Sequence, residues 1–417
     1  MIKNFFGLIV LLSSVAINAQ NGTSSVYSYF GIGDVTFKGT TENRSMAGVS
    51  VFSDSTHINL QNPASFAGLK VTSFTMGGSH SITDFTTNTA ESKSRRSSVE
   101  YLALGFPISP KLGAGFGIMP YSSVGYKIQH RATDLNDRGQ RYFGNGGLNK
   151  VFFAAGYKLT SKINVGMDLQ YNFGEIQTTG ITFLPGNDYG SRELNTSDMS
   201  GLSINTSLMF KSKLKNKMDI YGSFVFTPES NLKLGNARNI ATILYSEDSG
   251  EVIVDPLDID VKDGTIKLPM KVAFGAGIGV ERKWLLGTEI TLQQSESMTN
   301  RFDDIDNGYF ENGQKYSLGG YYIPNYNSFT SYLARITYRG GLRYEKTGLV
   351  VNDKSIDDMA VTAGLGLPLR GTFSNINIGF EFGKRGTKAA DLVRENYKNI
   401  SISLTLNDLW FRKSKYD

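Results

Sequence analysis

The chain has 417 residues, with 43 Lys and Arg against 38 Asp and Glu, and it contains 46 Gly but no Cys. Without cysteine it has no disulfide, thiolate metal site or cysteine nucleophile, and three scattered histidines argue against a multi-histidine metal centre. A net charge of +5 argues against a nucleic-acid partner, and the mean hydropathy of -0.22 excludes a helical membrane bundle but not a membrane β-barrel.

Residues 1–19 predict a secretory signal peptide. Lys3 precedes an apolar run from Phe5 to Val15, and the small residue Ala19 precedes the expected cleavage position. The alternative is an N-terminal membrane anchor, but the apolar run is shorter than the ~20 residues that a spanning helix needs. We therefore expect an exported protein of a Gram-negative cell, located in the outer membrane.

Residues 20–69 lack strand-like alternation and are rich in Gly, Ser and Asn. The segment contains Asn62-Pro63-Ala64 and the run Phe30 to Asp34. A loose periplasmic tail is the alternative, but the scattered Tyr and Phe residues give the segment more apolar surface than disorder favours. Because a wide barrel leaves an open channel unless something fills it, we expect these residues to form a hatch in the lumen.

Residues 70–417 alternate with a period of two. In one example, Val165, Met167, Leu169 and Tyr171 are separated by Gly166, Asp168 and Gln170. Such a strand has one apolar and one small or polar face. A soluble β-sandwich also alternates, but its strands are shorter than the about nine to eleven residues of a tilted membrane strand. The predicted fold is all-β: a transmembrane antiparallel β-barrel with the hatch in its lumen.

Thirteen ranges alternate clearly, whereas bacterial barrels usually have an even number of strands, so we expect about fourteen. The ranges are 71–81, 97–108, 111–129, 148–159, 162–174, 199–211, 216–228, 266–281, 283–294, 332–347, 358–369, 373–385 and 397–409. The missing strand is expected in 175–188, in 231–245, or within 332–347 with a bulge at Gly340-Gly341. Long polar stretches are expected to be outer loops, namely 82–96, 130–147, 175–198, 229–265 and 295–331.

Asn62-Pro63-Ala64 ahead of the first strand resembles the signature in the hatch of the long-chain fatty-acid transporter (FadL-type) outer-membrane family. Leu268-Pro269 with Gly275 and Gly277, followed by Lys283-Trp284 and Glu289, is similar to a later hairpin of that family. The resemblance implies a fourteen-stranded barrel, a hatch, and sideways exit of an apolar ligand through a kinked third strand. The outer loops match no known pattern, so no residues of an external binding groove can be assigned.

The third predicted strand contains Met119-Pro120-Tyr121. Proline cannot donate a ladder hydrogen bond, so it opens or bulges the pairing of a closed barrel. Pro120 is therefore a candidate for a lateral gap, and the alternative is a proline at the rim of the strand. We name Asn62, Pro63 and Ala64 as gating residues of the hatch and Pro120 as the gating residue of the wall.

No catalytic or cofactor motif is present. Ser79-His80 with Asp84 suggests a hydrolase triad, but adjacent strand residues point to opposite faces. The acidic groups at Asp255 to Asp263 and at Asp303 to Asp306 do not match calcium-loop spacing, so solvated loops are favoured over calcium sites. We therefore expect no cofactor, no metal and no enzyme activity.

Two functions remain open. The first is passage of hydrophobic small molecules, fatty-acid-like or aromatic, across the outer membrane by apolar burial in the lumen. The second is an accessory or plug subunit of a type IX protein secretion translocon, acting by protein contact. The expected partners are outer-membrane lipid and a hydrophobic ligand, with a large translocon protein in the second case and no nucleic acid.

Overall fold

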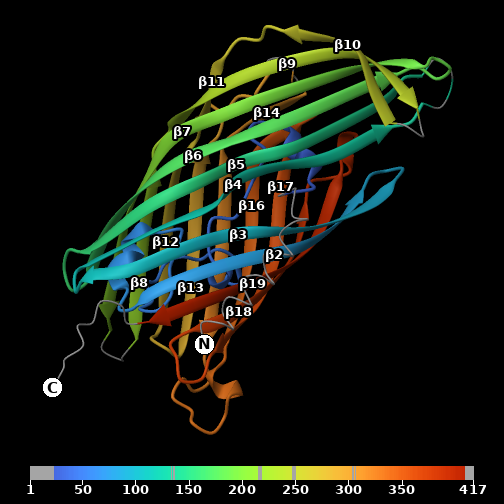
Figure 1. Cartoon of the computed structure of the whole chain (residues 1–417). Coiled ribbons are helices and arrows are strands. Elements are labelled where there is room, and N and C mark those ends of the chain that lie inside the picture. The colour runs from blue at the N-terminus through green and yellow to red at the C-terminus, as the bar shows by residue number, and fades with distance from the viewer. Residues whose placement is uncertain are drawn as a thin grey trace, which may run out of the picture.

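The computed structural model describes residues 23–408 apart from 133, 135–136, 215–217, 247–249, 303–304 and 306. The predicted signal peptide and the acidic residues Asp303, Asp304 and Asp306 lie outside the described residues. The described strands form one antiparallel sheet, which closes into a tall barrel because β19 pairs with β2 (Figure 1). No helix among the described residues is long and apolar enough to cross a membrane.

The first half of the wall consists of β2 (Thr72–Thr86), β3 (Glu91–Ser109), β4 (Leu112–His130), β5 (Gly139–Lys158), β6 (Ile163–Phe183), β7 (Tyr189–Lys213), β8 (Asp219–Thr227) and β9 (Ser230–Ser246). The second half consists of β10 (Gly250–Ile259), β11 (Gly264–Leu268), β12 (Met270–Val280), β13 (Trp284–Gln294), β14 (Gly308–Phe310), β15 (Gly313–Tyr322), β16 (Thr337–Val351), β17 (Lys354–Pro368), β18 (Asn375–Arg385) and β19 (Arg394–Asp408). Two short 3₁₀ helices, η4 (Leu333–Arg335) and η5 (Ala389–Asp391), lie in connections between wall strands.

Three wall strands are interrupted, so these elements make fourteen strands in the described part of the chain. β8 and β9 both pair with β7 and form one strand. β10 and β11 pair with β9, while β12 pairs with β8, so these three form the next strand. β14 and β15 both pair with β16. The predicted fourteen-stranded antiparallel barrel is confirmed.

The predicted position of the missing strand was wrong. It is formed by β14 and β15, within 308–322, which the sequence assigned to a long outer loop. The ranges 175–188 and 231–245 extend β6 and β9 instead. No register shift occurs at Gly340-Gly341; the irregularity of β16 lies between Lys346 and Val350.

Four of the predicted loops are also mostly strand. β7 alone has 25 residues, more than twice the length that a membrane strand needs. The outer connections that follow β2 and β6 shrink to residues 87–90 and 184–188. Strand pairing in these extensions does not depend on an apolar face. Their sequences therefore do not alternate, and a search for alternation cannot find them. Turns such as 110–111 and 281–283 mark the opposite, periplasmic end.

The outer face carries an apolar band. One row of register partners follows seven neighbouring strands: Leu404, Met76, Leu102, Ile118, Val151, Tyr171 and Leu202. Leu102, Ile118, Val151, Tyr171 and Leu202 of this row are all exposed. Large apolar side chains exposed in a continuous row are typical of a wall that faces acyl chains.

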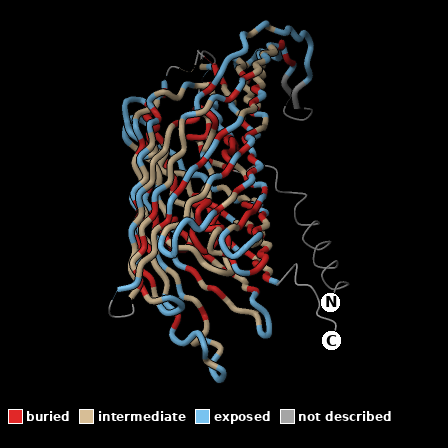
Figure 2. Tube along the Cα trace, turned by 90° about the vertical axis from the view of Figure 1, so that its left-hand side faces the viewer, coloured by how far each residue is buried: buried red, intermediate tan, exposed pale blue. Residues whose placement is uncertain are grey.

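The N-terminal segment, residues 23–71, lies inside the barrel (blue in Figure 1) and is mostly buried. Figure 2 shows that buried parts of the chain gather in the interior of the barrel. It contains η2 (Val26–Tyr29), β1 (Asp34–Val35), α2 (Thr41–Arg44) and η3 (Pro63–Gly68). η3 contacts β3 to β7, while α2 contacts β17, β18 and β19 on another part of the wall. Because it reaches wall strands on different sides, the segment crosses the lumen.

Candidate functional site

The ladder between β3 and β4 is incomplete. The two strands pair only from Leu102 to Ser109 on β3, opposite Ile118 to Leu112 on β4. Residues 91–101 of β3 pair with β2 alone, and residues 119–130 of β4 pair with β5. In Figure 1 the β2–β3 pair diverges from β4 toward the outer end. Along this stretch the wall strands have no ladder between them, which leaves a seam that we call the β3–β4 gap.

The N-terminal segment covers the free edge of β4 at this gap. β1 adds to β4 as a two-residue antiparallel strand, with Asp34 opposite Ser123 and Val35 opposite Ser122. The Thr36 amide donates to the Tyr121 carbonyl at 3.0 Å, and the Ser122 hydroxyl donates to the Ile32 carbonyl at 2.6 Å. A buried backbone group without a partner costs about 1–3 kcal/mol, so β1 stabilises an edge that β3 leaves unpaired.

Two glycines let the segment approach β4. Gly31 and Gly33 have φ of 55° and 90°, a region that favours glycine. A Cβ at Gly33 would lie 2.6 Å from the Val124 side chain and 2.7 Å from the Ser123 carbonyl oxygen. The run from Phe30 to Asp34 therefore matters as the turn that delivers β1 to the gap.

An outer cavity of about 1050 Å³ lies between the separated edges of β3 and β4. Its walls are residues of β3 (Glu91 to Arg96), residues of β4 (Gly125 to Gln129) and the start of the N-terminal segment. Lys93, Arg95, Arg96 and Lys127 line it, against the acidic residues Glu91 and Asp391. The cavity is thus mainly basic and has an apolar floor at Val26, Tyr27, Tyr29 and Phe30.

A second cavity, of about 270 Å³, lies in the lumen between the N-terminal segment and the wall. Apolar side chains line one part of it, including Phe30, Ile32, Met298, Phe310, Leu349 and Ile356. Lys38, Lys271 and Lys315 line it as well, and in the described part of the chain none of the three forms an ion pair. Burial, with Lys150 and Lys315 nearby, holds the pKa of Lys38 well below its usual range despite Asp168. Glu289 and Glu345 line this cavity as well, so it combines apolar surface with an excess of basic over acidic side chains.

A chain of ion pairs joins β1 to the wall strands β16, β17 and β18. Asp34 Oδ1 lies 2.8 Å from Arg385 Nη1 on β18, and Arg385 Nε lies 3.1 Å from Asp358 on β17. Arg343 on β16 pairs with Asp358 at 3.0 Å and with Glu381 at 3.1 Å. The residue that seals the β3–β4 gap is therefore also the end of a buried charge network.

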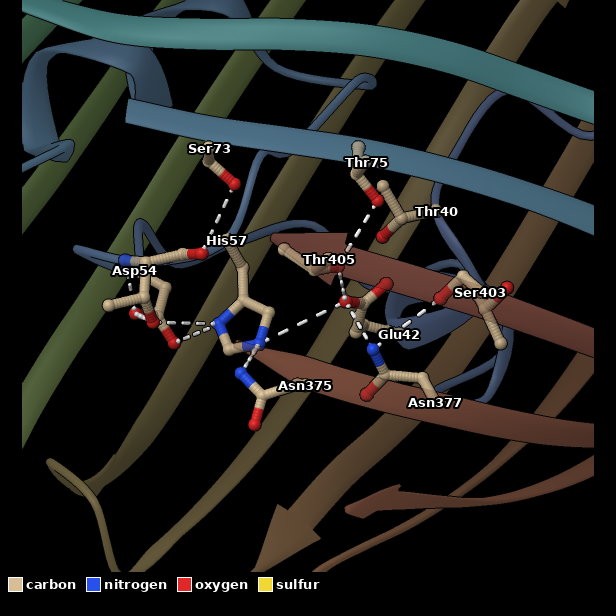
Figure 3. A network of polar contacts seen from close by, with 12 residues as sticks. Thr40, Glu42, Asp54, His57, Ser73, Thr75, Asn375, Asn377, Ser403 and Thr405 are labelled. Carbon is tan, nitrogen blue, oxygen red and sulfur yellow. Dashed lines mark hydrogen bonds and ion pairs between the residues drawn. The ribbon is translucent and has the colours of Figure 1, made fainter. Parts of the chain in front are cut away.

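A separate polar network fixes the segment near the periplasmic end (Figure 3). Glu42 accepts hydrogen bonds from Asn377 at 2.8 Å and from Thr405 at 3.4 Å, side chains of β18 and β19. His57 lies 2.9 Å from Asp54 through Nδ1 and 3.9 Å from Glu42 through Nε2. This network joins two parts of the N-terminal segment to two wall strands.

Charge neighbours set the protonation of this network. Burial by itself lowers the pKa of His57, but the carboxylates of Asp54 and Glu42 outweigh burial and raise that pKa above its ordinary value. Burial acts in the opposite sense on Asp54, yet His57 and Thr56 hold the pKa of Asp54 far below its usual range. Both shifts favour the charged form of the His57–Asp54 pair, which ties the loop at residues 54–57 together.

Asn62, Pro63 and Ala64 lie at the start of η3, against β5, β6 and β7. Asn62 caps η3 by accepting from the Ala64 amide at 3.1 Å, and that amide also donates to Ser207 on β7 at 2.8 Å. The wall makes room with glycine: a Cβ at Gly166 would lie 2.2 Å from the Ala64 nitrogen. These three residues anchor the segment, and their gating role stays a prediction.

Pro120 lies two residues beyond Ile118, the last β4 residue that pairs with β3. A register shift between Pro120 and Ser122 also bulges β4 against β5. The structure thus brings Pro120 to the β3–β4 gap but not to Asn62–Ala64, and its role in gating stays a prediction.

Sequence reasoning missed Asp34, Lys38, Lys271, Lys315 and Arg385. Lys271 on β12 and Lys315 on β15 lie on the faces that otherwise carry small residues. A lysine on such a face is unusual, so the alternation gave a weak indication that the two are functional. Arg385 could not be linked to Asp34, because no local pattern connects residues 351 positions apart.

Several solved structures share this fold. The Ralstonia pickettii toluene transporter TbuX has a TM-score of 0.60 and 14% identity over 89% of this chain and 99% of its own. The Pseudomonas putida toluene transporter TodX has a TM-score of 0.60 and 15% identity over 89% and 99%. A Pseudomonas aeruginosa FadL homologue has a TM-score of 0.56 and 11% identity over 90% and 98%. At these identities the likeness shows the fold, and the predicted FadL-type architecture is confirmed.

The fold and the exposed apolar band place the chain in the outer membrane of a Gram-negative cell. None of these comparisons involves type IX secretion, so that prediction stays untested. No curated protein matches the chain. The BamG family model matches residues 1–417, the whole chain, and the protein is therefore a member of the BamG family.

Proposed function

We propose that this protein binds hydrophobic small molecules that carry an acidic group and passes them sideways out of the barrel through the β3–β4 gap. The observation that carries the proposal is the interrupted ladder, which is closed by the two residues of β1 and not by a wall strand. A seal made by a short strand of a different segment can leave without breaking the barrel, because β4 keeps its pairing with β5.

The two cavities support a route that ends at this gap. The outer cavity and the lumen cavity are both lined by Tyr27 and Phe30, so these side chains lie between them. Movement of the short η2 and β1 elements would join the cavities along the edge of β4. Apolar burial, worth about 25 cal/mol per Å², would hold the apolar part of a ligand on this route.

The lining of both cavities favours an acidic group on the ligand. The proteins named TodX and TbuX are described as toluene transporters, and toluene has no charge. Here Lys38, Lys271 and Lys315 face the lumen cavity without ion pairs in the described residues. An ammonium group without a direct ion pair can form one with a carboxylate that enters the cavity.

The test locks the seal in a chain that has no other cysteine. Val35 and Ser122 are register partners on antiparallel strands, a geometry that a disulfide can span. In cells that produce the Val35→Cys, Ser122→Cys protein, oxidation should lower uptake of radiolabelled decanoate at least tenfold, and reduction should restore it.

A matched control joins two wall strands that are already paired. Ser79 and Ser401 are register partners on β2 and β19, and a disulfide between cysteines at these positions should leave decanoate uptake unchanged. Equal uptake by the oxidised and reduced Val35→Cys, Ser122→Cys protein would refute lateral passage.

A further inference from the structure

The seal at the β3–β4 gap is weak by itself. β1 has two residues, and an isolated pair of short strands is marginal in water. Val35 is 41% exposed, so the apolar side chain of this strand adds little burial. The side chain of Asp34 links β1 to a second wall strand, β18, and so adds to the hold of β4 on β1.

The ion pair of Asp34 with Arg385 supplies that hold. The two residues are joined by a direct contact of 2.8 Å between Asp34 Oδ1 and Arg385 Nη1. The other carboxylate oxygen of Asp34 accepts from the Thr23 hydroxyl at 3.1 Å. Because β1 sits on β4 while Arg385 is on β18, this pair links β1 to a second part of the wall.

Arg385 has one fixed and one exchangeable acidic partner. Asp358 has a 2% exposed side chain and also receives Arg343 at 3.0 Å and the Tyr397 hydroxyl at 2.7 Å. The Asp34 side chain is 21% exposed, and Thr23 and Arg385 are the side chains that donate to it among the described contacts. Loss of Asp34 therefore leaves Arg385 anchored to β17, whereas loss of Asp358 would unpair several buried groups.

The exchangeable partner faces the cavity that a ligand would fill. Asp34 and Arg385 both line the lumen cavity, together with Lys38, Lys271 and Lys315. A carboxylate in this cavity can therefore contact Arg385, and the lysines add to the positive charge around it.

We propose that the Asp34–Arg385 ion pair is the latch of the lateral gate, and that the acidic group of the ligand opens the gate by replacing the Asp34 carboxylate on Arg385. This inference rests on the function proposed above. The exchange conserves charge, since one carboxylate leaves the guanidinium as another arrives. Once released, Asp34 no longer holds β1 on the edge of β4, so the molecule that is to pass is also the signal for opening.

The test measures how often β1 is docked. In the purified full-length protein with Val35→Cys and Ser122→Cys, the rate of disulfide formation under a fixed oxidant reports the docked state. Adding Asp34→Asn should slow this rate at least tenfold without any ligand, and Asp34→Glu should restore part of it. As a matched control, Asp84→Asn removes an exposed ion pair with Lys93 at 3.4 Å and should leave the rate unchanged.

Decanoate and decanol separate charge from apolarity. In the double-cysteine protein that keeps Asp34, decanoate should slow disulfide formation at least fivefold and decanol should not. In the double-cysteine protein with Asp34→Asn, decanoate should have no further effect. An unchanged rate in Asp34→Asn, or equal effects of the two probes, would overturn the latch. The uptake experiment and the disulfide-rate experiment test different claims. If the disulfide between positions 35 and 122 does not block decanoate uptake, the proposed function is wrong, even when Asp34→Asn slows disulfide formation. Heat-modifiable migration in gels confirms that each variant is a folded barrel.

Discussion

The charged side chains of the lumen fall into two groups, and the difference assigns their roles. Asp34, Arg385 and Asp358 compensate one another through direct ion pairs. Lys271 and Lys315 face the lumen cavity, and within the described residues neither forms an ion pair. Compensated charges hold structure together, whereas uncompensated ones lower stability and are expected where a ligand brings the counter-charge.

Replacing the two lysines should separate stability from binding. Lys271→Met with Lys315→Met removes two cations that form no direct ion pair within the described residues, so the variant should unfold at about the same temperature as the parent. Its affinity for decanoate should fall about tenfold or more for each lost ion pair worth ~1.4 kcal/mol, while decanol binding stays the same. Isothermal titration calorimetry of both probes measures this, and equal loss of both affinities would contradict an acid-binding role.

Gly166 should accept no side chain without moving η3. A Cβ there would lie 2.2 Å from the Ala64 nitrogen and 2.4 Å from the Pro63 carbonyl carbon. Gly166→Ala should therefore displace the anchor of the N-terminal segment at a cost of about 1–3 kcal/mol, seen as faster proteolysis of the segment. Gly222→Ala, with Phe210 Cβ 3.7 Å away, is the harmless comparison; equal protection in both variants would argue against tight seating of η3.

His57 should make the docking of the segment depend on pH. Its folded-state pKa is raised, through Asp54 and Glu42, above the unfolded value of about 6.5. Protonated His57 therefore contributes its full stabilisation below about pH 6.5, and this contribution is lost as pH rises through the folded-state pKa. NMR titration of histidine carbon-bound protons, assigned with His57→Gln, should place the His57 pKa above 6.5 and Asp54→Asn should lower it. A value at or below 6.5 would refute the charged pair.

At the scale of elements, β1 and η2 are held from two sides. The segment between β13 and β14 crosses over η2, where Arg301 donates to the carbonyl of Tyr29 at 3.0 Å and to that of Gly31. Asn300 accepts from the Gly31 amide at 3.0 Å. Burial lowers the pKa of Arg301 to about 10, so the guanidinium stays charged at neutral pH.

Loss of Arg301 should loosen η2 without opening the wall. Arg301→Met leaves two buried carbonyls without donors, a cost of about 1–3 kcal/mol each, so amides in residues 26–33 should exchange at least tenfold faster in hydrogen-exchange mass spectrometry. Exchange within β5 should not change. Lys267→Met, which removes an exposed ion pair with Glu229 at 3.1 Å, serves as the control. Unchanged exchange in residues 26–33 would show that Arg301 does not hold η2.

Prediction from sequence succeeded where one face of an element is apolar. The wall strands that cross the membrane alternate, so β6 and β19 were found from residues such as Val165 to Phe173 and Ile400 to Leu406. β14 and β15 were missed because Gly319, Gly320 and their polar neighbours break the pattern. Glycine on the inner face makes room for the N-terminal segment, as Gly319 does for Met46. The same glycines weaken the alternation, which is why sequence analysis did not identify the strand.

For the whole molecule, the central question is the direction of the path. A porin-like barrel conducts along its axis, but here the N-terminal segment contacts β3 to β7 on one side and β17 to β19 on another. The wall, in contrast, lacks a ladder between residues 91–101 of β3 and 119–130 of β4. Pro120 could be identified from sequence because proline interrupts strand pairing. The pairing of Asp34 with β4 could be identified only from the structure, because the two segments are far apart in the sequence. The geometry favours a sideways route over an axial one.

Photolabelling tests the direction of this path most directly. A decanoate analogue with a diazirine at its tail is allowed to enter intact cells that produce the protein, illuminated, and mapped by mass spectrometry. A sideways route predicts labels on residues 31–35 of the N-terminal segment and on residues 119–130 of β4, and the oxidised Val35→Cys, Ser122→Cys protein should lose the labels on β4. Labels that instead follow the axis to η3 and to the periplasmic turns, with equal strength in the locked protein, would contradict the account.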